Sequence, residues 1–404
     1  MATLASLADG ALVKFGSIYE KPIIWRVIGQ NHYGDGQTSL VTDRLIKYMC
    51  VDAKESSNSD SGREYFGNNR YIYSNMHQWL NSDAVSWYTA QHSADAPPSN
   101  ANVWDNYNEY DTFPGFLNGF TADEKNAIRN TSLTCERASV DGGGVDSFTA
   151  KVFLLSCTEI GLSGGQVCGT QFPMFNSDSA RLAYGTAEAV ANSEYKDINT
   201  STTSSGYWWL RDAYASDSRS VNGVDASGSL DRDRAFRGYR GARPALNLSS
   251  SISLSSSTDA DGCYTLVLLL NTVTFNSNGG IFSSDSTTSK SVQTNLDGTV
   301  SLSSIVEFPV KSGYAFKGWS TTENGSVVYT PYATPTITED TTLYAVWEKV
   351  ELYLVHKDTL VNIANAVRSK TGGTDAIALG DMATMIAALG PTISASSDTL
   401  TITN

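Results

Sequence analysis

The chain has 404 residues, which at roughly 150 residues per domain corresponds to about three domains. Its formal net charge is −14, with 28 Lys and Arg against 42 Asp and Glu. This acidic balance argues against nucleic-acid binding, which needs a basic surface. No apolar run approaches the roughly 18 residues of a membrane-spanning helix, and the N-terminus lacks the basic and apolar regions of a secretory signal. We therefore expect neither membrane insertion nor a secretion signal.

The residue types favour a β-rich binding protein over a helical enzyme. Charged residues make up only 17% of the chain, whereas 20 Tyr, 8 Trp and 33 Gly suit strands and turns on an extracellular or virion surface. The four histidines are scattered without a metal-binding motif, and no nucleophile, base and orienting group share a recognisable spacing. The sequence thus predicts no enzyme activity, no metal and no cofactor. The cysteines are widely spaced and are expected to be buried free thiols: Cys50, Cys135, Cys157, Cys168 and Cys263.

Short strands and short helices alternate along residues 1–250, in an order that predicts an α+β fold. Ser74 is placed to cap a short helix, and Thr121 followed by Glu124 forms a capping box at the start of another. The expected helices cover 122–130 and 179–184, and the expected strands cover 23–28, its partner 39–42, 152–156, 207–210 and 245–248.

The composition changes three times after residue 250. Residues 251–270, which begin with a Ser-rich stretch, are predicted to form a connector or strand. Apolar and polar residues alternate over 271–348 as in strands, and the pattern of 349–404 is helical. Within the last segment, apolar residues over 360–367 follow helical spacing and end at a pair of glycines suited to a helix C-cap. A second short helix is expected at 378–389, and 392–404 is strand-like.

Six motifs carry a family resemblance over about residues 10–250. They are WRVI at 25–28, HQWLN at 77–81, FTADE at 120–124, VFLLS at 152–156, YWWLR at 207–211 and GARPAL at 241–246. In this order they resemble a C-type-lectin-fold domain related to sulfatase-modifying factors, which is common in gut bacteria and their phages. The resemblance implies a C-type lectin fold for 1–250. It also implies that about 211–243, between the last two motifs, is varied by a diversity-generating retroelement, which copies a template with errors at adenines.

The residue types present in 211–243 fit copying with errors at adenines. The segment contains seven Arg and no Lys, five Asp and no Glu, and neither Gln nor Met, although the chain elsewhere has 13 Lys. Changes at the adenines of an Asn codon that ends in a pyrimidine can give Asn, Asp, Ser, Arg, Tyr, Phe or Gly, but not Lys, Glu, Gln, Met or Trp. The alternative is an ordinary polar loop of 33 residues that uses only Arg by chance.

We expect the polar and aromatic residues of this segment to form a ligand-binding surface on a rigid scaffold. In the alternating run Asp231-Arg232-Asp233-Arg234, neighbouring side chains are expected to pair when free and to exchange partners on binding. Trp208, Trp209, Pro244 and Leu246 are expected in the core, and no calcium-binding motif is apparent. The expected ligand-binding residues are Asp212, Tyr214, Asp217, Ser218, Arg219, Ser220, Asn222, Asp225, Asp231, Arg232, Asp233, Arg234, Phe236 and Arg237.

The remaining segments resemble two other modules. Residues 271–348, with GYAFKGWS at 313–320 and TLYAVW at 342–347, resemble the Listeria–Bacteroides surface repeat, also called the internalin B-repeat. This implies a small β-grasp-like fold that serves as a spacer. Residues 349–404 are similar to a helical segment of tail proteins from phages of Gram-positive bacteria, or form a generic helical hairpin. The expected core of the repeat is Phe275, Phe316, Trp319, Tyr344 and Trp347.

These features predict a diversified receptor-binding protein of a phage or prophage, made in the host cytoplasm and carried on the virion tail. Its partners would be a host-surface protein or glycan and phage structural proteins, and multivalent binding favours a homo-oligomer. The alternative is a bacterial cell-surface adhesin with a fixed lectin-like site. The repeat favours the adhesin, and the expected lack of a secretion signal opposes it. Both interpretations give a role and leave the ligand, the subunit number and calcium open.

Overall fold

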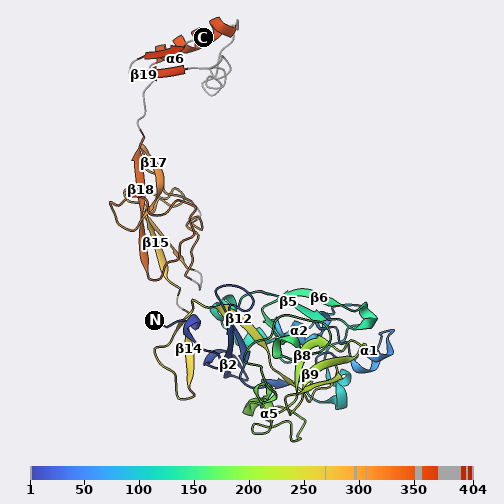
Figure 1. The fold of residues 1–404 in the computed structure, drawn as a ribbon. Helices are drawn as coiled ribbons and strands as arrows, with labels where there is room; N and C mark the ends of the chain where they lie inside the picture. Colours follow the sequence, from blue (N-terminus) through green and yellow to red (C-terminus); the bar gives the residue numbers. More distant parts are fainter. Residues whose placement is uncertain are drawn as a thin grey trace. The chain divides into compact units, whose positions relative to one another are not determined.

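The computed structural model describes residues 2–268, 270–294, 298–305, 307–350, 357–371, 393–396 and 399–402 (Figure 1). Strands dominate and helices are few and mostly short, in agreement with the predicted α+β class. Tertiary contacts divide the chain into two compact units. The first contains Met1–Thr274, Ser291–Ser304 and Ala333–Thr341, and the second contains Phe275–Lys290, Ile305–Tyr332 and Thr342–Asn404.

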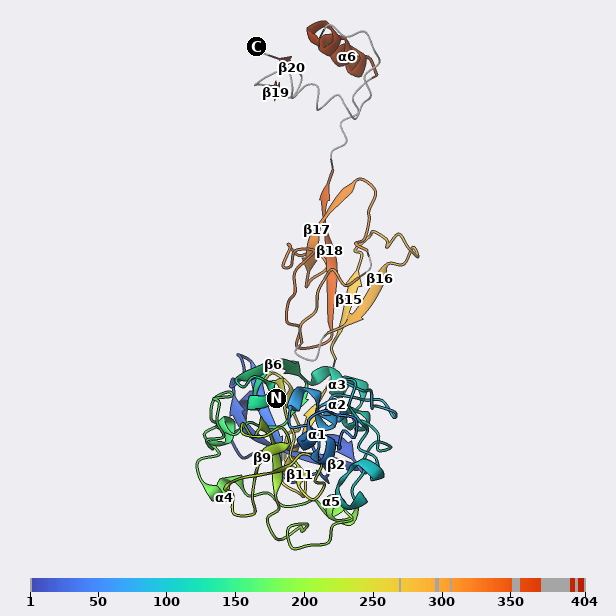
Figure 2. The ribbon, with the colours of Figure 1, turned by 90° about the vertical axis from the view of Figure 1, so that its right-hand side faces the viewer.

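A seven-stranded sheet forms the framework of the first unit (Figures 1 and 2). Its order is β13-β14-β1-β2-β3-β12-β7. The predicted pairing of 23–28 with 39–42 is confirmed, because β2 and β3 are antiparallel with Trp25 opposite Thr42. The strands are β1 Leu12–Ile18, β2 Lys21–Gln30, β3 Gln37–Thr42, β7 Val152–Phe153, β12 Ala245–Ser249, β13 Ser253–Leu254 and β14 Cys263–Val267.

Two strands of this sheet, β13 and β14, lie within 251–270, where the sequence predicted a connector or strand. Strand β14 runs parallel to β1, with Leu12 opposite Cys263, and β13 pairs antiparallel with β14. Cys263 and Leu266 of β14 are buried. Burial of these two residues and the pairing with β1 place β14 in the sheet.

A five-stranded sheet in the order β10-β9-β8-β11-β4 contains four strands that lie wholly or partly within 211–243. Strand β9 lies between β8 and β10, and all five of its residues are buried. The segment is therefore not the long loop that its polar composition suggested. Its backbone N–H and C=O groups are satisfied by neighbouring strands. The strands are β4 Lys47–Tyr48, β8 Trp208–Ala213, β9 Ser220–Val224, β10 Leu230–Arg234 and β11 Gly241–Ala242.

The helices of the first unit are short and are started by side-chain caps. Ser74 accepts a hydrogen bond from the His77 main-chain N–H, and the capping box of Thr121 and Glu124 is present, both as predicted. The helix after Thr121 ends at Ala127, earlier than expected, because Ile128 turns extended and bridges to β12.

The remaining elements of the first unit are as follows. The α-helices are α1 Ser61–Phe66, α2 Asn75–Leu80, α3 Ala122–Ala127, α4 Asp178–Arg181 and α5 Ala187–Ala191, and the separate hairpin is β5 Thr131–Glu136 with β6 Val145–Ala150. The 3-10 turns are η1 Leu4–Ser6, η2 Tyr71–Tyr73, η3 Asn100–Asn102, η4 Trp104–Asn106, η5 Phe116–Gly119, η6 Ser139–Asp141 and η7 Thr158–Ile160. Among the described helices, none is both long and apolar enough to cross a membrane.

Large aromatic side chains fill the interior of the first unit. The predicted core positions Trp208, Trp209, Pro244 and Leu246 are all buried. The buried indoles keep hydrogen-bond partners, with Trp208 Nε1 donating to a main-chain oxygen at 3.1 Å and Trp209 Nε1 to the Met49 oxygen at 2.9 Å. The five cysteines are free and buried, as expected.

A four-stranded sheet in the order β16-β15-β18-β17 is centred on the predicted repeat (Figure 2). Phe275 and Trp319 are fully buried, as predicted, but Phe316, Tyr344 and Trp347 are only half-buried. The helix of a β-grasp fold is not found within the described part of 272–350. The strands are β15 Thr272–Asn276, β16 Ser289–Gln293, β17 Tyr314–Ser320 and β18 Thr341–Lys349.

The first helix predicted for the C-terminal segment is confirmed as α6, Lys357–Thr371. Part of the strand-like end forms an antiparallel pair, β19 Ile393–Ser396 and β20 Thr399–Ile402. The second predicted helix, 378–389, lies outside the described residues.

Candidate ligand-binding surface

Both ends of 211–243 are anchored in the interior by arginines. Arg211 and Glu159 form an ion pair with no exposed side-chain surface, with N–O distances of 2.5 and 2.6 Å. At the other end, burial lowers the pKa of Arg243 to about 10, and its Nε donates to the Thr42 main-chain oxygen. A cation this deeply buried needs such partners. The two arginines therefore hold the segment in place and are not available to a ligand.

Asp212 and Asn222, both predicted to bind ligand, are buried structural residues. Asp212 accepts hydrogen bonds from the main-chain N–H groups of Glu136 at 3.1 Å and Cys157 at 2.6 Å, and burial raises its pKa. Asn222 Nδ2 donates to the Ala213 main-chain oxygen at 3.1 Å. Each side chain forms hydrogen bonds with nearby backbone groups, so its polar atoms stabilise the fold and are not available to a ligand.

Ser218, Ser220 and Phe236 are likewise buried. The Ser218 hydroxyl donates to Asp60 at 2.5 Å, and the Ser220 hydroxyl donates to Asp217 at 2.8 Å. Side chains with so little exposed surface cannot contact a ligand in this conformation. Five of the fourteen predicted positions are thus corrected to structural roles: Asp212, Ser218, Ser220, Asn222 and Phe236.

The acids and arginines of 231–234 point to opposite faces of β10, because successive side chains alternate across a strand. Asp231 accepts from the buried Arg240, whose Nη2 lies 2.5 Å from Asp231 Oδ2. Asp233 accepts from the Tyr239 hydroxyl and lies 3.6 Å from Arg240 Nε. The predicted pairing of neighbours within this run is therefore not found: both acids lie near Arg240, and Asp233 Oδ1 is also 3.3 Å from Arg237 Nε.

Three arginines of this segment lie over aromatic rings. The guanidinium carbon of Arg232 is 4.0 Å from the ring centroid of Tyr214. Arg219 and Arg234 both lie over Phe66, at 5.0 and 4.3 Å. Within the described part of the chain, these three guanidinium groups make no hydrogen bond or ion pair. Stacking fixes their orientation and leaves their N–H donors available.

An aromatic cluster continues beside this group. Arg237 lies 4.4 Å over the Trp104 ring, and Trp104 stacks on Tyr195 with ring centroids 5.8 Å apart. Tyr239 contacts both rings, and Tyr107, which is 42% exposed, packs edge-on against Tyr195. Such rings offer large contact area at small entropic cost.

Main-chain hydrogen bonds join these segments. The Phe236 N–H donates to the Phe66 oxygen at 3.0 Å, and the Trp104 N–H donates to the Phe236 oxygen at 3.1 Å. We call the resulting patch the arginine–aromatic surface and define it by Phe66, Trp104, Tyr214, Arg219, Arg232, Arg234 and Arg237. Strand β9 and helix α1, which border it, are visible in Figure 1.

Asp217 and Asp225, the last two predicted positions, shape turns. Asp217 Oδ1 accepts from the main-chain N–H of Arg219 at 3.0 Å. Although burial opposes the effect, hydrogen bonds from Ser227 and Ser229 hold the pKa of Asp225 below its usual value. Both residues are half-buried. They set the backbone path on either side of β9, which is the usual role of Asp in turns.

Phe66 and Trp104 were missed because they lie outside 211–243. The only sequence signal was the aromatic and Asn-rich stretch 104–110. Within it, Asp105 and Asn106 adopt positive φ angles of 57° and 60°, which Asp and Asn tolerate better than most residues. Nothing in the local pattern shows that these rings would meet arginines more than a hundred residues away.

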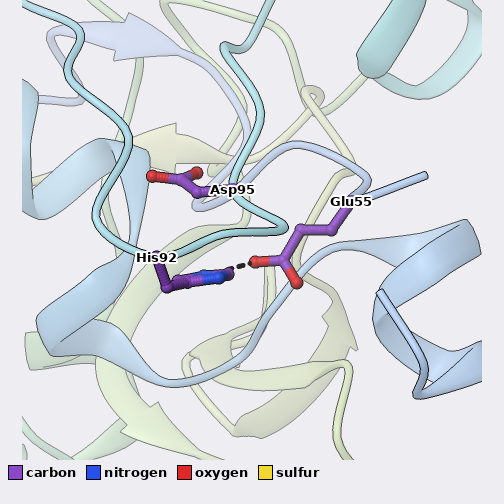
Figure 3. Close-up of side chains that lie close together, drawn as sticks. All are labelled: Glu55, His92 and Asp95. Atoms are coloured by element: carbon purple, nitrogen blue, oxygen red, sulfur yellow. Dashed lines mark ion pairs between the residues drawn. The ribbon is translucent and has the colours of Figure 1, made fainter. Parts of the chain in front are cut away.

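Two further groups of side chains contain nucleophilic or metal-ligating atoms. Burial raises the pKa of the Cys157 thiol and raises that of Cys168 to about 12, so both thiols remain protonated and poorly nucleophilic. In contrast, Glu55, His92 and Asp95 bring metal-ligating atoms together within the described part of the chain (Figure 3). No sequence motif indicates this group, because Glu55 and His92 are 37 positions apart.

Comparison with known families identifies both modules. Residues 35–250 match the family described as a domain of unknown function, DUF6273. Because the match covers more than half of the 404 residues, the chain belongs to this family. Residues 272–346 match the Listeria-Bacteroides repeat domain, which confirms the repeat predicted at 271–348. No curated protein matches the chain.

Proposed function

We propose that this protein is a diversified receptor-binding protein of a phage or prophage. Its arginine–aromatic surface, displayed on a C-type lectin scaffold, would bind a protein or glycan on the host surface. The observation that carries the proposal is the set of three stacked arginines, Arg219, Arg232 and Arg234, with free donors. They lie in a segment whose buried ends are fixed by Arg211 and Arg243.

The chemistry of this surface suits a ligand rich in hydrogen-bond acceptors. A guanidinium group offers planar, multidentate donors to carboxylate, sulfate, phosphate or carbonyl oxygens. Stacking on a ring contributes about 0.5–1 kcal/mol at an exposed site, enough to orient each arginine before binding. Pre-orientation reduces the entropy lost on association.

The division between variable and fixed residues also fits diversification. Tyr214, Arg219, Arg232 and Arg234 are all types that adenine errors in an Asn codon can produce. Phe66, on which two of these arginines stack, lies outside 211–243 and would stay constant. Changing the exposed residues would thus alter recognition while a constant ring and a buried scaffold hold the new side chains.

The other parts of the chain have supporting roles in this proposal. The Listeria-Bacteroides repeat would act as a spacer, and the C-terminal segment would attach the protein to phage structural proteins or to sister subunits. The repeat match also favours the second candidate, a bacterial surface adhesin with a fixed site. Neighbouring genes distinguish the two, since tail genes support the first and a surface-anchoring locus supports the second.

The decisive test is the DNA around codons 211–243. We expect a nearby near-copy that differs only opposite template adenines, together with a reverse transcriptase gene. Substitutions should fall on the codons of the exposed positions and spare those of Arg211 and Arg243. The absence of both the copy and the reverse transcriptase would refute diversification and leave the adhesin as the better explanation.

Binding is tested with labelled full-length protein on intact cells of candidate host bacteria and on a glycan array. The triple variant Arg219→Ala, Arg232→Ala, Arg234→Ala should lose binding while keeping its melting temperature within a few degrees. Arg44→Ala is the control, because Arg44 also lies over an aromatic ring, 5.9 Å from the Tyr184 centroid, but does not belong to this surface. Equal binding by the triple variant and wild type would refute the site.

A further inference from the structure

Glu55, His92 and Asp95 converge from two loops of the first unit (Figure 3). One ligating atom from each lies within 4.8 Å of the other two. His92 Nε2 is 2.9 Å from Glu55 Oε1, and the Glu55 side chain is only 1% exposed. Atoms bound to one tetrahedral zinc ion at 2.0–2.2 Å are about 3.4 Å apart. Small side-chain adjustments would therefore suffice to place all three around an ion.

Amide groups hold both carboxylates in position. Asn68 Nδ2 donates to Glu55 Oε1 at 3.3 Å, and Asn75 Nδ2 donates to Asp95 Oδ1 at 3.3 Å. Each amide is itself oriented by its oxygen, which accepts a main-chain N–H: that of Arg70 for Asn68 and that of Ala53 for Asn75. Metal-ligating carboxylates commonly have such outer partners, which fix the ligand before the ion arrives.

The electrostatics of the group also favour a cation. Asp52 lies beside it, and its own burial, followed by the charges of Glu55 and Asp95, raises its pKa. Among the described residues, none of these three carboxylates forms an ion pair with Lys or Arg. Buried carboxylates without a cationic partner are costly. A divalent ion would remove this imbalance.

His92 supplies an independent observation. Its Nε2 atom is buried and has no hydrogen-bond partner, although Glu55 Oε1 is only 2.9 Å away. The two atoms are close, but they are not aligned for an N–H donor to reach the oxygen. A ring nitrogen that lies this close to a carboxylate without donating to it is placed as a metal-ligating nitrogen would be.

We propose that Glu55, His92 and Asp95 bind a divalent transition-metal ion of the zinc type. His92 Nε2 and one carboxylate oxygen from each acid are the protein ligands, and water completes the coordination sphere. The imidazole selects against calcium, which prefers six to eight oxygen ligands. Zinc accepts a mixed set of nitrogen and oxygen ligands at lower coordination number.

The ion would fasten the loop carrying Glu55 to the loop carrying His92 and Asp95. The Glu55 N–H donates to the Arg63 main-chain oxygen at 3.1 Å, which joins the site to helix α1 and so to Phe66. The metal is thus expected to order the edge of the arginine–aromatic surface. This consequence for ligand binding rests on the proposed function, whereas metal binding itself does not.

The test is calorimetric titration of chelator-treated, full-length protein with Zn²⁺, and separately with Ca²⁺. We expect one Zn²⁺ per chain and no comparable binding of Ca²⁺. His92→Ala and Glu55→Gln should each weaken Zn²⁺ binding by about 100-fold. Matched controls are His32→Gln and Asp83→Asn, which lie outside the group and should bind Zn²⁺ as wild type does. Melting temperatures measured in chelator show whether each variant is folded.

A second measurement remains informative if His92→Ala or Glu55→Gln fails to fold. Co²⁺ bound to wild type should show visible absorption typical of a low-coordinate nitrogen and oxygen site, and His92→Cys should add a thiolate-to-cobalt charge-transfer band. No Zn²⁺ binding by wild type, binding unaffected by the ligand variants, preference for Ca²⁺, or loss of binding in the controls would overturn the proposal. None of these outcomes depends on whether the arginine–aromatic surface binds a ligand.

Discussion

Replacing Glu159 by Gln should destabilise the first unit strongly, although the change is nearly isosteric. Both side chains of the Arg211–Glu159 pair are fully buried, and the two short contacts of 2.5 and 2.6 Å satisfy both carboxylate oxygens. In Glu159→Gln the Arg211 cation remains buried without its counter-charge. Removing one partner of such a pair typically costs about 3–5 kcal/mol.

The loss of unfolding free energy is measured by urea unfolding followed by tryptophan fluorescence. In a separate thermal unfolding measurement, the melting temperature should fall by roughly 6–20 °C, because a domain of this size loses about 2–4 °C per kcal/mol. Arg234→Ala is the comparison, because Arg234 is half-buried and contributes one ring stack worth about 0.5–1 kcal/mol. A loss below about 1 kcal/mol for Glu159→Gln would refute the reasoning that Arg211 anchors the segment through this pair.

Three further predictions concern other parts of the chain. Burial lowers the pKa of His77 to about 4, so the unfolded chain binds more protons between pH 6.5 and 4. About 3 kcal/mol of stability, fully present above pH 6.5, should therefore be lost as pH falls to 4; an identical pH dependence of urea unfolding in His77→Gln would contradict this. The five buried thiols should react slowly with a thiol reagent in the native protein and together in urea, and one fast native thiol would disprove their burial. Trp319, packed between Phe275 and Phe316, should cost about 3–5 kcal/mol as Trp319→Ala, seen in calorimetry as a shift of the second unit's transition alone; a shift of the first unit's transition would count against it.

Local signals in the sequence predicted local structure well. The caps at Ser74 and Thr121, the paired strands around Trp25 and the buried Trp208 and Trp209 all appear as expected. Each depends on residues only a few positions apart or on apolar character alone. The repeat was equally readable, because its aromatic and glycine spacing is specific.

Predictions from polar composition were wrong where distant segments supply the hydrogen-bond and strand partners. Residues 211–243 are rich in Arg, Asp and Ser, which is typical of a loop, yet the segment contributes to four strands of a sheet. Asp212 and Asn222 form hydrogen bonds with buried backbone groups, and no spacing in the sequence predicts these bonds. Strand β14 likewise finds its place through a distant partner, because it pairs parallel with β1.

The sequence by itself determined the modules, the strand and helix starts and the segment in which recognition is proposed. Only the tertiary structure decided what its side chains contact, because alternation along β10 places Asp231 and Asp233 near Arg240 and leaves Arg232 and Arg234 over aromatic rings. It also brought Phe66 and Trp104 to those arginines and Glu55 to His92. Such contacts depend on how distant segments pack, whereas the periodicities and capping residues in a sequence predict only contacts between residues a few positions apart.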